Sequence, residues 1–534
     1  MRAFFKSLLV LPVCGFALVG AMAQLPKCPL RPSQGDEIRN PLDLQSQNGE
    51  LDVDLTLRNA LDSQTFMHVC YDYQNGDHRV ESPTLRINPG DYLVMHLTDH
   101  LDPKSINGLI EMGGEGEMEM SGMSDPASDD PCHGKHMTAA STNVHFHGMN
   151  IPPVCHQDEV VDTLIRPYDP AFEYRFQVPK NDAPGLYWYH PHPHGFASTQ
   201  VNGGATGALI IGGIEKFKPQ VLGLPERVFL VRQQFLNGNA WVPGPNQLTL
   251  NYQQALNFPP FGVIKVKPGQ KEFWRVANTT IQAFLTLQVL FGKTPQKMEL
   301  IALDGIPVKT RREVTTILIP PAGRAEFIVR GPQKNVTATF QTAGYNTGIT
   351  GNPNPQTTFA SIVASDDADE PPPIVPAVVP EVTPRFAGLA TAKPTKQRKL
   401  YFSERFGGIN SPIQFYVTVD GQKPKVFNPN DPPAIVTHVG AVEDWTIENR
   451  ALETHDFHIH QIHFLVLEEN GKKVPYPELQ DSIAIPFWKG SGPYPSVKLR
   501  MDFRQPSIAG TFVYHCHILD HEDAGMMAKI RVDP

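Results

Sequence analysis

Eight histidines of this chain fall into four pairs with one residue between the two members. The pairs are His145/His147, His190/His192, His458/His460 and His515/His517. Side chains at i and i+2 of a strand point to the same face, so each pair can offer two imidazoles to one place. A single pair is most often an ordinary core or surface feature, but four pairs predict a metal site. Eight neutral imidazoles suit copper, zinc, iron or nickel, and their number indicates more than one ion.

The residues around the last pair favour copper. Cys516 lies between the two histidines of that pair, and on a strand its side chain points away from both. Its thiolate could meet His521 and a distant histidine, for which His455 is available, with Met526 as a weak axial ligand. Two histidines, one cysteine and an axial methionine form the blue-copper electron-transfer set and a poor tetrahedral zinc set.

The elements that would carry these residues repeat three times. Strand–turn–strand segments centre on Gly90, Gly269 and Gly440, and we expect each segment to form a hairpin. Later strands that belong to the three copies are expected at 185–192, 337–345 and 510–517. Isolated hairpins are common in β-proteins, but three copies at near-equal spacing indicate a triplicated all-β sandwich. The first and third units hold two histidine pairs each, and the middle unit holds none.

The composition agrees with this interpretation. The 51 prolines make up about 10% of the 534 residues, about twice the average usage, and with 42 glycines they argue against a helical protein. The length suits three domains of average size. The net charge of −9 argues against nucleic acid as a main partner, because phosphate binding needs clustered Lys and Arg.

Domain boundaries follow from the repeats. We expect domain 1 at 24–212, domain 2 without copper ligands at 213–365, and domain 3 with the blue-copper set at 398–534. The proline-rich segment 366–397 is expected to be an extended, solvated linker.

Residues 1–23 predict a secretory signal. Arg2 and Lys6 precede an apolar run that ends at the small-residue cleavage site Ala21-Met22-Ala23. A membrane anchor is the weaker alternative, because Pro12 interrupts a run that is shorter than the ~20 residues a spanning helix needs. We therefore expect an exported, soluble protein of the periplasm or the extracellular space.

Export would place the cysteines in an oxidising compartment. Cys28, Cys70, Cys132 and Cys155 could form two disulfides in three possible pairings. Proximity along the chain weakly favours Cys28–Cys70 and Cys132–Cys155, and Cys516 is the cysteine left over.

Together the motifs resemble the three-domain multicopper oxidases, the family of laccases, bilirubin oxidases and bacterial copper oxidases. The four motifs that carry the resemblance are His145-Phe-His147-Gly, Trp188-Tyr-His190-Pro-His192, His455-Asp-Phe-His458-Ile-His460 and His515-Cys-His517-x₃-His521-x₄-Met526. They occur in the family's order and span most of the chain. The resemblance implies three consecutive cupredoxin-like Greek-key β-sandwich domains and four copper ions per chain: one type 1, one type 2 and two type 3.

The resemblance also assigns the ligands. Type 1 copper would be bound by His455, Cys516, His521 and Met526. Type 2 copper would be bound by His145 and His458. The type 3 pair would be bound by His147, His190, His192, His460, His515 and His517. Laid over Cys516, the other two units have Pro191 and Gly344, so only the third unit is expected to hold blue copper.

The implied activity couples one-electron oxidation of a small donor at type 1 copper to four-electron reduction of O₂ to water at the three-copper cluster. The donor would be a phenol, a pigment or a metal ion, and an axial methionine favours easily oxidised donors. We expect a monomer without a membrane partner. A copper-tolerance protein, acting as a cuprous oxidase or as a copper store, is the alternative; a store would not need Cys516 between two cluster histidines.

Five further residues lie beside the motifs. Glu522 and Asp158 are expected to supply protons at the cluster, or else to be structural carboxylates. Asp456 stands where the family usually has proline; it could tune His455 or meet a donor, or be a solvated loop acid. His194 and His463 have no family role and are expected to be ordinary polar residues.

An insertion at 111–140 is rich in methionine and histidine. Met112, Met118, Met120, Met123 and Met137 lie in it together with His133 and His136. Thioethers suit Cu(I), so the segment could collect copper for cuprous oxidation. An incidental acidic, disordered insertion is the alternative.

Deleting 111–139 tests the two alternatives. A copper-collecting segment predicts that Cu(I) oxidation falls while phenol oxidation is retained, both measured as oxygen uptake. Equal loss of both activities, or of neither, would contradict copper collection.

Overall fold

The computed structural model describes residues 28–61, 67–103, 106, 130–134, 137–234, 247–255, 258–407 and 413–534. The expected signal at 1–23 and most of the insertion at 111–140 lie outside the described residues. Within these ranges, no helix has the length and apolar character needed to cross a bilayer.

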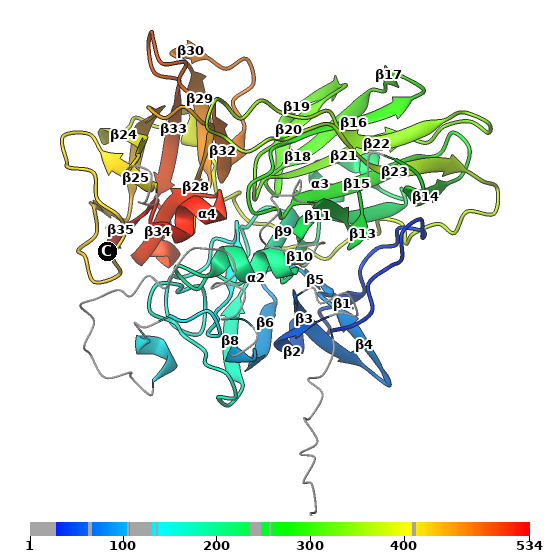
Figure 1. Cartoon of the computed structure of the whole chain (residues 1–534), viewed down its shortest axis with the longest axis horizontal. Helices are drawn as coiled ribbons and strands as arrows, with labels where there is room; N and C mark the ends of the chain where they lie inside the picture. The colour runs from blue at the N-terminus through cyan, green and yellow to red at the C-terminus, as the bar shows by residue number, and fades with distance from the viewer. Residues whose placement is uncertain are drawn as a thin grey trace, which may run out of the picture.

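The described chain folds into six sheets, grouped in three sandwiches along the sequence (Figure 1). In Figure 1, domain 1 (blue to cyan) lies at the bottom, domain 2 (green) at the upper right and domain 3 (yellow to red) at the upper left. Each sandwich has its own apolar core between its two sheets. The expected all-β architecture of three consecutive sandwiches is confirmed.

The sheets of domain 1 have the strand orders β1-β5-β10-β9-β7 and β4-β3-β2-β6-β8. Their bounds are β1 Asp43–Gln45, β2 Glu50–Leu61, β3 Met67–Asn75, β4 His78–Glu81, β5 Thr84–Ile87, β6 Tyr92–His100, β7 His145–His147, β8 Phe172–Gln177, β9 Gly185–His190 and β10 Gly207–Ile211. The short helices near them are η1 Pro131–His133, α2 Ala197–Gly203, α3 Ile214–Phe217 and η2 Pro219–Val221.

The sheets of domain 2 have the orders β13-β12-β11-β15-β21-β18-β19 and β14-β23-β22-β16-β17, with β20 beside β16. Their bounds are β11 Glu226–Gln234, β12 Gln247–Leu250, β13 Gln253–Gln254, β14 Gly262–Val266, β15 Lys271–Asn278, β16 Leu285–Phe291, β17 Thr294–Pro295, β18 Met298–Leu303, β19 Ile306–Val314, β20 Ile317–Ile319, β21 Arg324–Arg330, β22 Ala338–Thr342 and β23 Thr357–Ala364.

The sheets of domain 3 have the orders β25-β24-β27-β33-β29-β30, with β31 beside β29, and β26-β35-β34-β28-β32. Their bounds are β24 Lys396–Arg405, β25 Gln414–Val419, β26 Ile435–His438, β27 Ala441–Asn449, β28 His455–Ile459, β29 Phe464–Glu469, β30 Lys472–Lys473, β31 Leu479–Gln480, β32 Ser482–Ile485, β33 Ser496–Phe503, β34 Gly510–Cys516 and β35 Met527–Asp533. The short helices are η3 Leu389–Thr391, η4 Pro506–Ile508 and α4 Leu519–Asp523.

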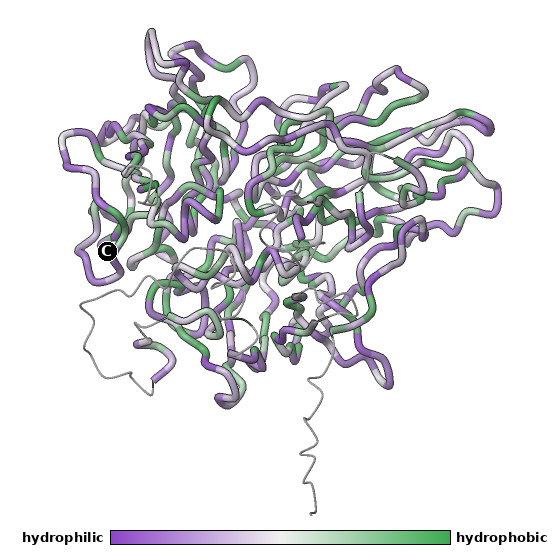
Figure 2. The backbone as a smooth tube through the Cα atoms, in the orientation of Figure 1, coloured by the Kyte–Doolittle hydropathy of each residue, from purple (hydrophilic) through white to green (hydrophobic). Residues whose placement is uncertain are grey.

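Alternation of side chains explains why these segments form sandwiches. In β8, Phe172, Tyr174 and Phe176 are buried, while the residues between them are exposed. Figure 2 shows the same alternation of hydrophobic and hydrophilic positions along many strands of the three domains. One face of each such strand is therefore available for the core, and the other faces solvent or a neighbouring domain.

The three turn glycines adopt the expected left-handed backbone, but the hairpin prediction is wrong. Gly90, Gly269 and Gly440 have φ of +97°, +69° and +93°. The strands on either side of each glycine belong to opposite sheets, namely β5 and β6, β14 and β15, and β26 and β27. The second strand of each segment instead pairs in parallel with an earlier strand, β2, β11 or β24. The chain thus crosses from one sheet of the sandwich to the other at each glycine, and the apolar faces of the two strands meet in the core between the sheets. A turn glycine in the sequence does not distinguish such a crossing from a hairpin.

The repeat itself is preserved in detail. Glu272 of domain 2 accepts hydrogen bonds from the indole of Trp274, at 2.8 Å, and from the guanidinium of Arg227, at 2.7 Å. Glu443 of domain 3 accepts the equivalent tryptophan and arginine bonds, at 2.8 and 2.6 Å. Buried polar groups need such partners, and the two domains satisfy them with the same glutamate–tryptophan–arginine hydrogen-bond arrangement.

The segment 366–397 runs along domains 1 and 2. The backbone of Ile374 exchanges hydrogen bonds with Gly223 and Leu224, each at 2.9 Å. Farther along, the buried guanidinium of Arg385 lies 3.3 Å from the carboxylate of Asp182. The segment is thus extended and anchored at both points, while Val378 between them is 88% exposed.

The favoured disulfide pairing is confirmed. Cys28 is bonded to Cys70 and Cys132 to Cys155, while Cys516 is free and buried. The first bridge ties the segment before β1 to β3 and closes a loop of 42 residues.

Replacing Cys28 and Cys70 together by alanine will destabilise domain 1. The chain-entropy relation for a loop of this length gives a loss of about 4 kcal/mol. Scanning calorimetry of the variant should show a lower midpoint temperature for the first unfolding transition. Reduction of the disulfides in the native protein should lower the same midpoint. An unchanged thermogram would contradict the prediction.

Candidate metal centre

Two antiparallel strand pairs deliver the eight paired histidines. In domain 1, β7 pairs with β9 so that His145 lies opposite His190. In domain 3, β28 pairs with β34 so that His458 lies opposite His515. The second histidine of each pair follows at i+2, on the same side of the chain. All eight side chains are buried, each with at most 1% of its surface exposed.

The histidines of domains 1 and 3 interleave across the domain boundary. The imidazoles of His145 and His460 stack with their centroids 3.7 Å apart, and those of His147 and His458 stack at 4.0 Å. Three groups have ligand atoms within 4.8 Å of one another: His147/His190/His517, His192/His460/His515 and His145/His147/His458. The structure therefore places all eight residues in one cluster, in sets that can surround separate ions.

Unpartnered ring nitrogens show that this cluster suits a metal. The buried nitrogens without a hydrogen-bond partner are His145 Nε2, His147 Nδ1, His190 Nε2, His192 Nε2, His458 Nε2, His460 Nδ1 and both nitrogens of His517. Leaving so many buried acceptors unsatisfied is costly, and coordination of copper ions by the lone pairs would satisfy them.

The opposite nitrogens are held by the protein. His458 Nδ1 donates to the peptide oxygen of Asp481 at 2.8 Å, and His190 Nδ1 donates to that of Pro191 at 2.9 Å. His145 Nδ1 lies 3.0 Å from the carboxylate of Asp158. Such contacts fix the ring orientation and leave the other nitrogen deprotonated for a metal.

Burial also keeps these imidazoles in the ligand form. Loss of solvation, followed by the nearness of other imidazoles, lowers the pKa of His145, His147, His458, His460 and His517 well below the usual range. A neutral imidazole offers a lone pair, whereas an imidazolium does not.

A second centre forms around Cys516. Its Sγ lies 3.5 Å from His455 Nδ1 and 3.9 Å from His521 Nδ1, and the two nitrogens are 3.3 Å apart. The turn of α4 brings His521 back to the thiol, and the peptide oxygen of the buried Met526 accepts a hydrogen bond from Cys516 N at 3.1 Å. Two imidazoles and one thiol converging on one point fit a blue-copper ion. Axial ligation by Met526 remains a prediction.

Two carboxylates at this centre were not recognised in the sequence. Glu404 of β24 lies 3.0 Å from His455 Nε2, and Glu453 lies 3.3 Å from His521 Nε2. Glu453 is only two residues from His455 and could have been noticed, but Glu404 is 51 residues away. Burial, together with the neighbouring Glu404, raises the pKa of Glu453 to about 9.

The two acids expected at the cluster both lie against it. The carboxylate of Glu522 lies 3.0 Å from His515 Nδ1, which itself donates to the peptide oxygen of Cys516, and 3.4 Å from His192 Nε2. Burial opposes its ionisation, but these two imidazoles lower the pKa of Glu522 to about 2. Asp158 accepts hydrogen bonds from Phe146 N and from the Gln461 amide, and burial raises its pKa.

Asp456 and His463 differ from the expectations. Asp456 is fully buried, and among the described residues its carboxyl oxygens have no hydrogen-bond partner, so the alternative of a solvated loop acid is wrong. Burial raises its pKa. His463 is also fully buried, and its Nε2 donates to the peptide oxygen of Asp304 at 2.8 Å.

Family models described as multicopper oxidase match three parts of the chain. The matched residues are 135–215, 228–366 and 407–534, one part in each sandwich. Together they cover all four histidine motifs.

Relatives and solved structures agree. The multicopper oxidase mco of Staphylococcus haemolyticus is 24% identical over 408 residues, covering 73% of this chain and 77% of that protein. A laccase of Haloferax volcanii is 24% identical over 418 residues, covering 73% and 67%. The structure of McoA from Aquifex aeolicus has a TM-score of 0.67 at 19% identity and covers 94% of this chain and all of that one.

A Campylobacter jejuni multicopper oxidase, described as a metallo-oxidase, has a TM-score of 0.63 at 21% identity and covers 96% of each chain. The three sandwiches are therefore cupredoxin-like domains, and the two histidine centres are consistent with a type 1 and a trinuclear copper site. The chain belongs to the multicopper oxidase family, the copper-dependent oxidoreductases that reduce O₂.

Proposed function

We propose that this oxidase takes its electrons from small hydrophilic donors, metal ions above all, that bind in a polar pocket beside His521. The pocket lies where domain 2 meets domain 3. Its existence next to a ligand of the Cys516 centre is the observation that carries the proposal.

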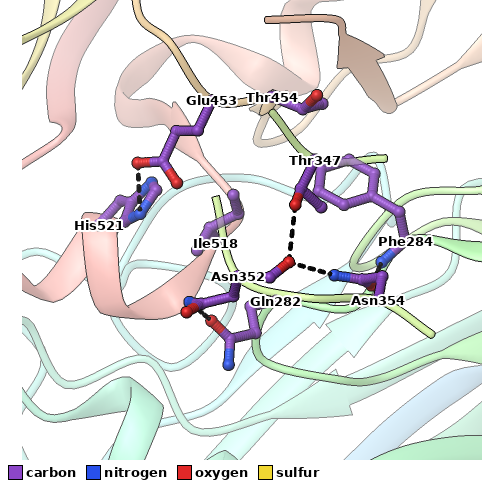
Figure 3. Close-up of a pocket in the computed structure, with 9 residues that line it drawn as sticks. All are labelled: Gln282, Phe284, Thr347, Asn352, Asn354, Glu453, Thr454, Ile518 and His521. Atoms are coloured by element: carbon purple, nitrogen blue, oxygen red, sulfur yellow. Dashed lines mark hydrogen bonds and ion pairs between the residues drawn. The ribbon is translucent and has the colours of Figure 1, made fainter. Parts of the chain in front are cut away.

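The pocket is lined mainly by polar groups (Figure 3). The lining residues are Gln282, Phe284, Thr347, Asn352, Asn354, Glu453, Thr454, Ile518 and His521. Figure 3 shows the carboxylate of Glu453 directed at the imidazole of His521. Carboxylate, amide and hydroxyl oxygens suit a hydrated or partly dehydrated cation, whereas only Phe284 offers an aromatic face.

The size of the pocket favours the same donors. Its interior is far smaller than the ~300–1,000 Å³ typical of sites for organic ligands. Its inner part has room for about one water-sized group. Phenols and pigments would have to react from outside the pocket.

The protein's own residues would act at both ends of the reaction. Bound copper would supply one-electron oxidation of the donor and four-electron reduction of O₂. Glu453 would bind the cation and release its proton, and its Oε1 would orient His521 through Nε2. At the cluster, Glu522 would orient His515 through the 3.0 Å contact at Nδ1, and its ionised carboxylate would relay protons for the reduction of O₂.

Export to the periplasm or the extracellular space remains part of the proposal. It is supported by the two disulfides, since such bonds persist in oxidising compartments.

Glu453→Gln should weaken the use of metal ions selectively. Glutamine has no proton to release and cannot become an anionic ligand, so the KM for Fe(II) or Cu(I) should rise about 10-fold, which corresponds to about 1.4 kcal/mol, while oxidation of a methoxyphenol changes little. Steady-state oxygen uptake with the separate donors measures the effect.

Glu404→Gln is the control, because Glu404 contacts His455 but does not line the pocket. Glu404 also raises the pKa of Glu453, so removal of its charge should make Glu453 easier to ionise and should not raise the KM for metal ions. Equal KM changes in both variants, or equal loss of phenol and metal oxidation in Glu453→Gln, would point to altered redox potential and refute cation binding.

Glu522→Gln should slow O₂ reduction without disturbing the Cys516 centre. Loss of a proton-transferring group typically costs 10²-fold or more, so oxygen uptake at saturating donor should fall about 10²-fold while the blue absorption is retained. Asp523→Asn is the control, because its carboxylate accepts from Ala197 N and Ser198 N rather than from a copper ligand. Similar losses in both variants would contradict a specific role for Glu522.

A further inference from the structure

The middle domain has no copper ligand, yet one of its side chains reaches the histidine cluster. Arg324, the first residue of β21, is fully buried. Its guanidinium donates two parallel hydrogen bonds to the carboxylate of Asp481 in domain 3, at 2.7 and 2.6 Å. This bidentate arrangement is the most directional ion pair that proteins form.

Asp481 in turn holds two candidate ligands from different domains. Its Oδ1 lies 3.2 Å from His147 Nε2, and its peptide oxygen accepts from His458 Nδ1 at 2.8 Å. The nitrogens opposite these contacts, His147 Nδ1 and His458 Nε2, are the unpartnered ones that face the cluster. Any shift of Asp481 would therefore rotate a type 3 ligand and a type 2 ligand together.

Another acid, which belongs to domain 2, holds the Arg324–Asp481 ion pair in place. Asp304 accepts the backbone N–H of Arg324 at 2.8 Å and the backbone N–H of Asp481 at 3.2 Å. His463 joins the network with its Nε2 3.4 Å from the Asp481 carboxylate. The pair is thus clamped through both main chain and side chain.

The chain next to His147 leaves space for this pair. A Cβ at Gly148 would lie 2.4 Å from Arg324 Nη2 and 2.7 Å from Asp481 Oδ2, and the φ of Gly148 is +86°. Glycine is therefore required directly after the ligand, because any side chain there would displace the ion pair. The position of the Arg324–Asp481 ion pair and the backbone conformation directly after His147 therefore depend on each other.

We propose that Arg324 is a positioning residue through which the ligand-free domain 2 sets copper binding at the three-copper cluster. It fixes Asp481, and Asp481 fixes the ring orientations of His147 and His458. The proposal rests on the assignment of these histidines as copper ligands and not on the choice of donor.

Arg324→Lys tests the proposal, because lysine keeps the charge but cannot make the bidentate contact. Loss of an outer partner typically lowers metal affinity 10–100-fold, so we expect about a 10-fold lower copper affinity at the cluster. Copper retained after dialysis against graded chelator, the type 2 electron paramagnetic resonance signal and the near-ultraviolet type 3 band should all change. The blue absorption of the Cys516 centre should not.

Arg385→Lys is the matched control, since Arg385 is equally a buried partner of a carboxylate, Asp182, but contacts no copper ligand. Its cluster copper and type 2 spectrum should match those of the parent protein. Thermal unfolding of the copper-free forms separates lost stability from lost positioning.

Wild-type copper affinity and type 2 spectrum in Arg324→Lys would overturn the proposal, and so would equal copper loss in Arg385→Lys. If Arg324→Lys does not fold, Asp481→Asn is measured in the same way, and an unchanged type 2 spectrum there would overturn it. A defect in donor use alone, with a normal cluster, would concern the donor pocket instead.

Discussion

Desolvation of eight imidazoles in one interface is the constraint on which the rest of this structure depends. The histidines come from two domains, and among the described residues seven of the eight have a buried nitrogen without a hydrogen-bond partner. Such an arrangement is unfavourable by itself, because buried polar atoms without partners cost free energy. It becomes favourable only when metal ions occupy the centre, so copper binding and the docking of domain 1 on domain 3 must stabilise each other.

The imidazole nitrogens that point away from the candidate metal positions show how the two centres are adapted to different tasks. At the cluster they contact peptide oxygens and buried acids such as Asp158 and Glu522. At the Cys516 centre they contact Glu404 and Glu453, and Glu453 also lines the polar pocket. The carboxylates at the cluster can transfer protons inside the protein. At the Cys516 centre, Glu453 can contact donors that enter the pocket from solvent.

The sequence predicted which histidines come together, but it did not predict most of the residues that hold them. Histidines at i and i+2 share a face whatever the sheet, so the clusters could be predicted from spacing alone. The hairpins could not, because a turn glycine such as Gly90 says nothing about which sheet the next strand joins. Glu404 and Arg324 are distant in sequence from the ligands they support, and nothing in their neighbouring residues marks them. Burial of Asp456 likewise depends on tertiary packing rather than on its local sequence.

Domain 2 shows why a unit without ligands belongs in this protein. It contributes Gln282, Asn352 and Asn354 to the pocket beside His521, and it contributes Arg324 to the support of His147. One contribution lies beside the Cys516 centre, at the proposed donor pocket, and the other lies at the histidine cluster. A change in how domain 2 packs would therefore alter donor access and cluster geometry at once. The middle sandwich is best understood as a frame that couples the two ends of the reaction, because it contacts both centres without supplying a ligand to either.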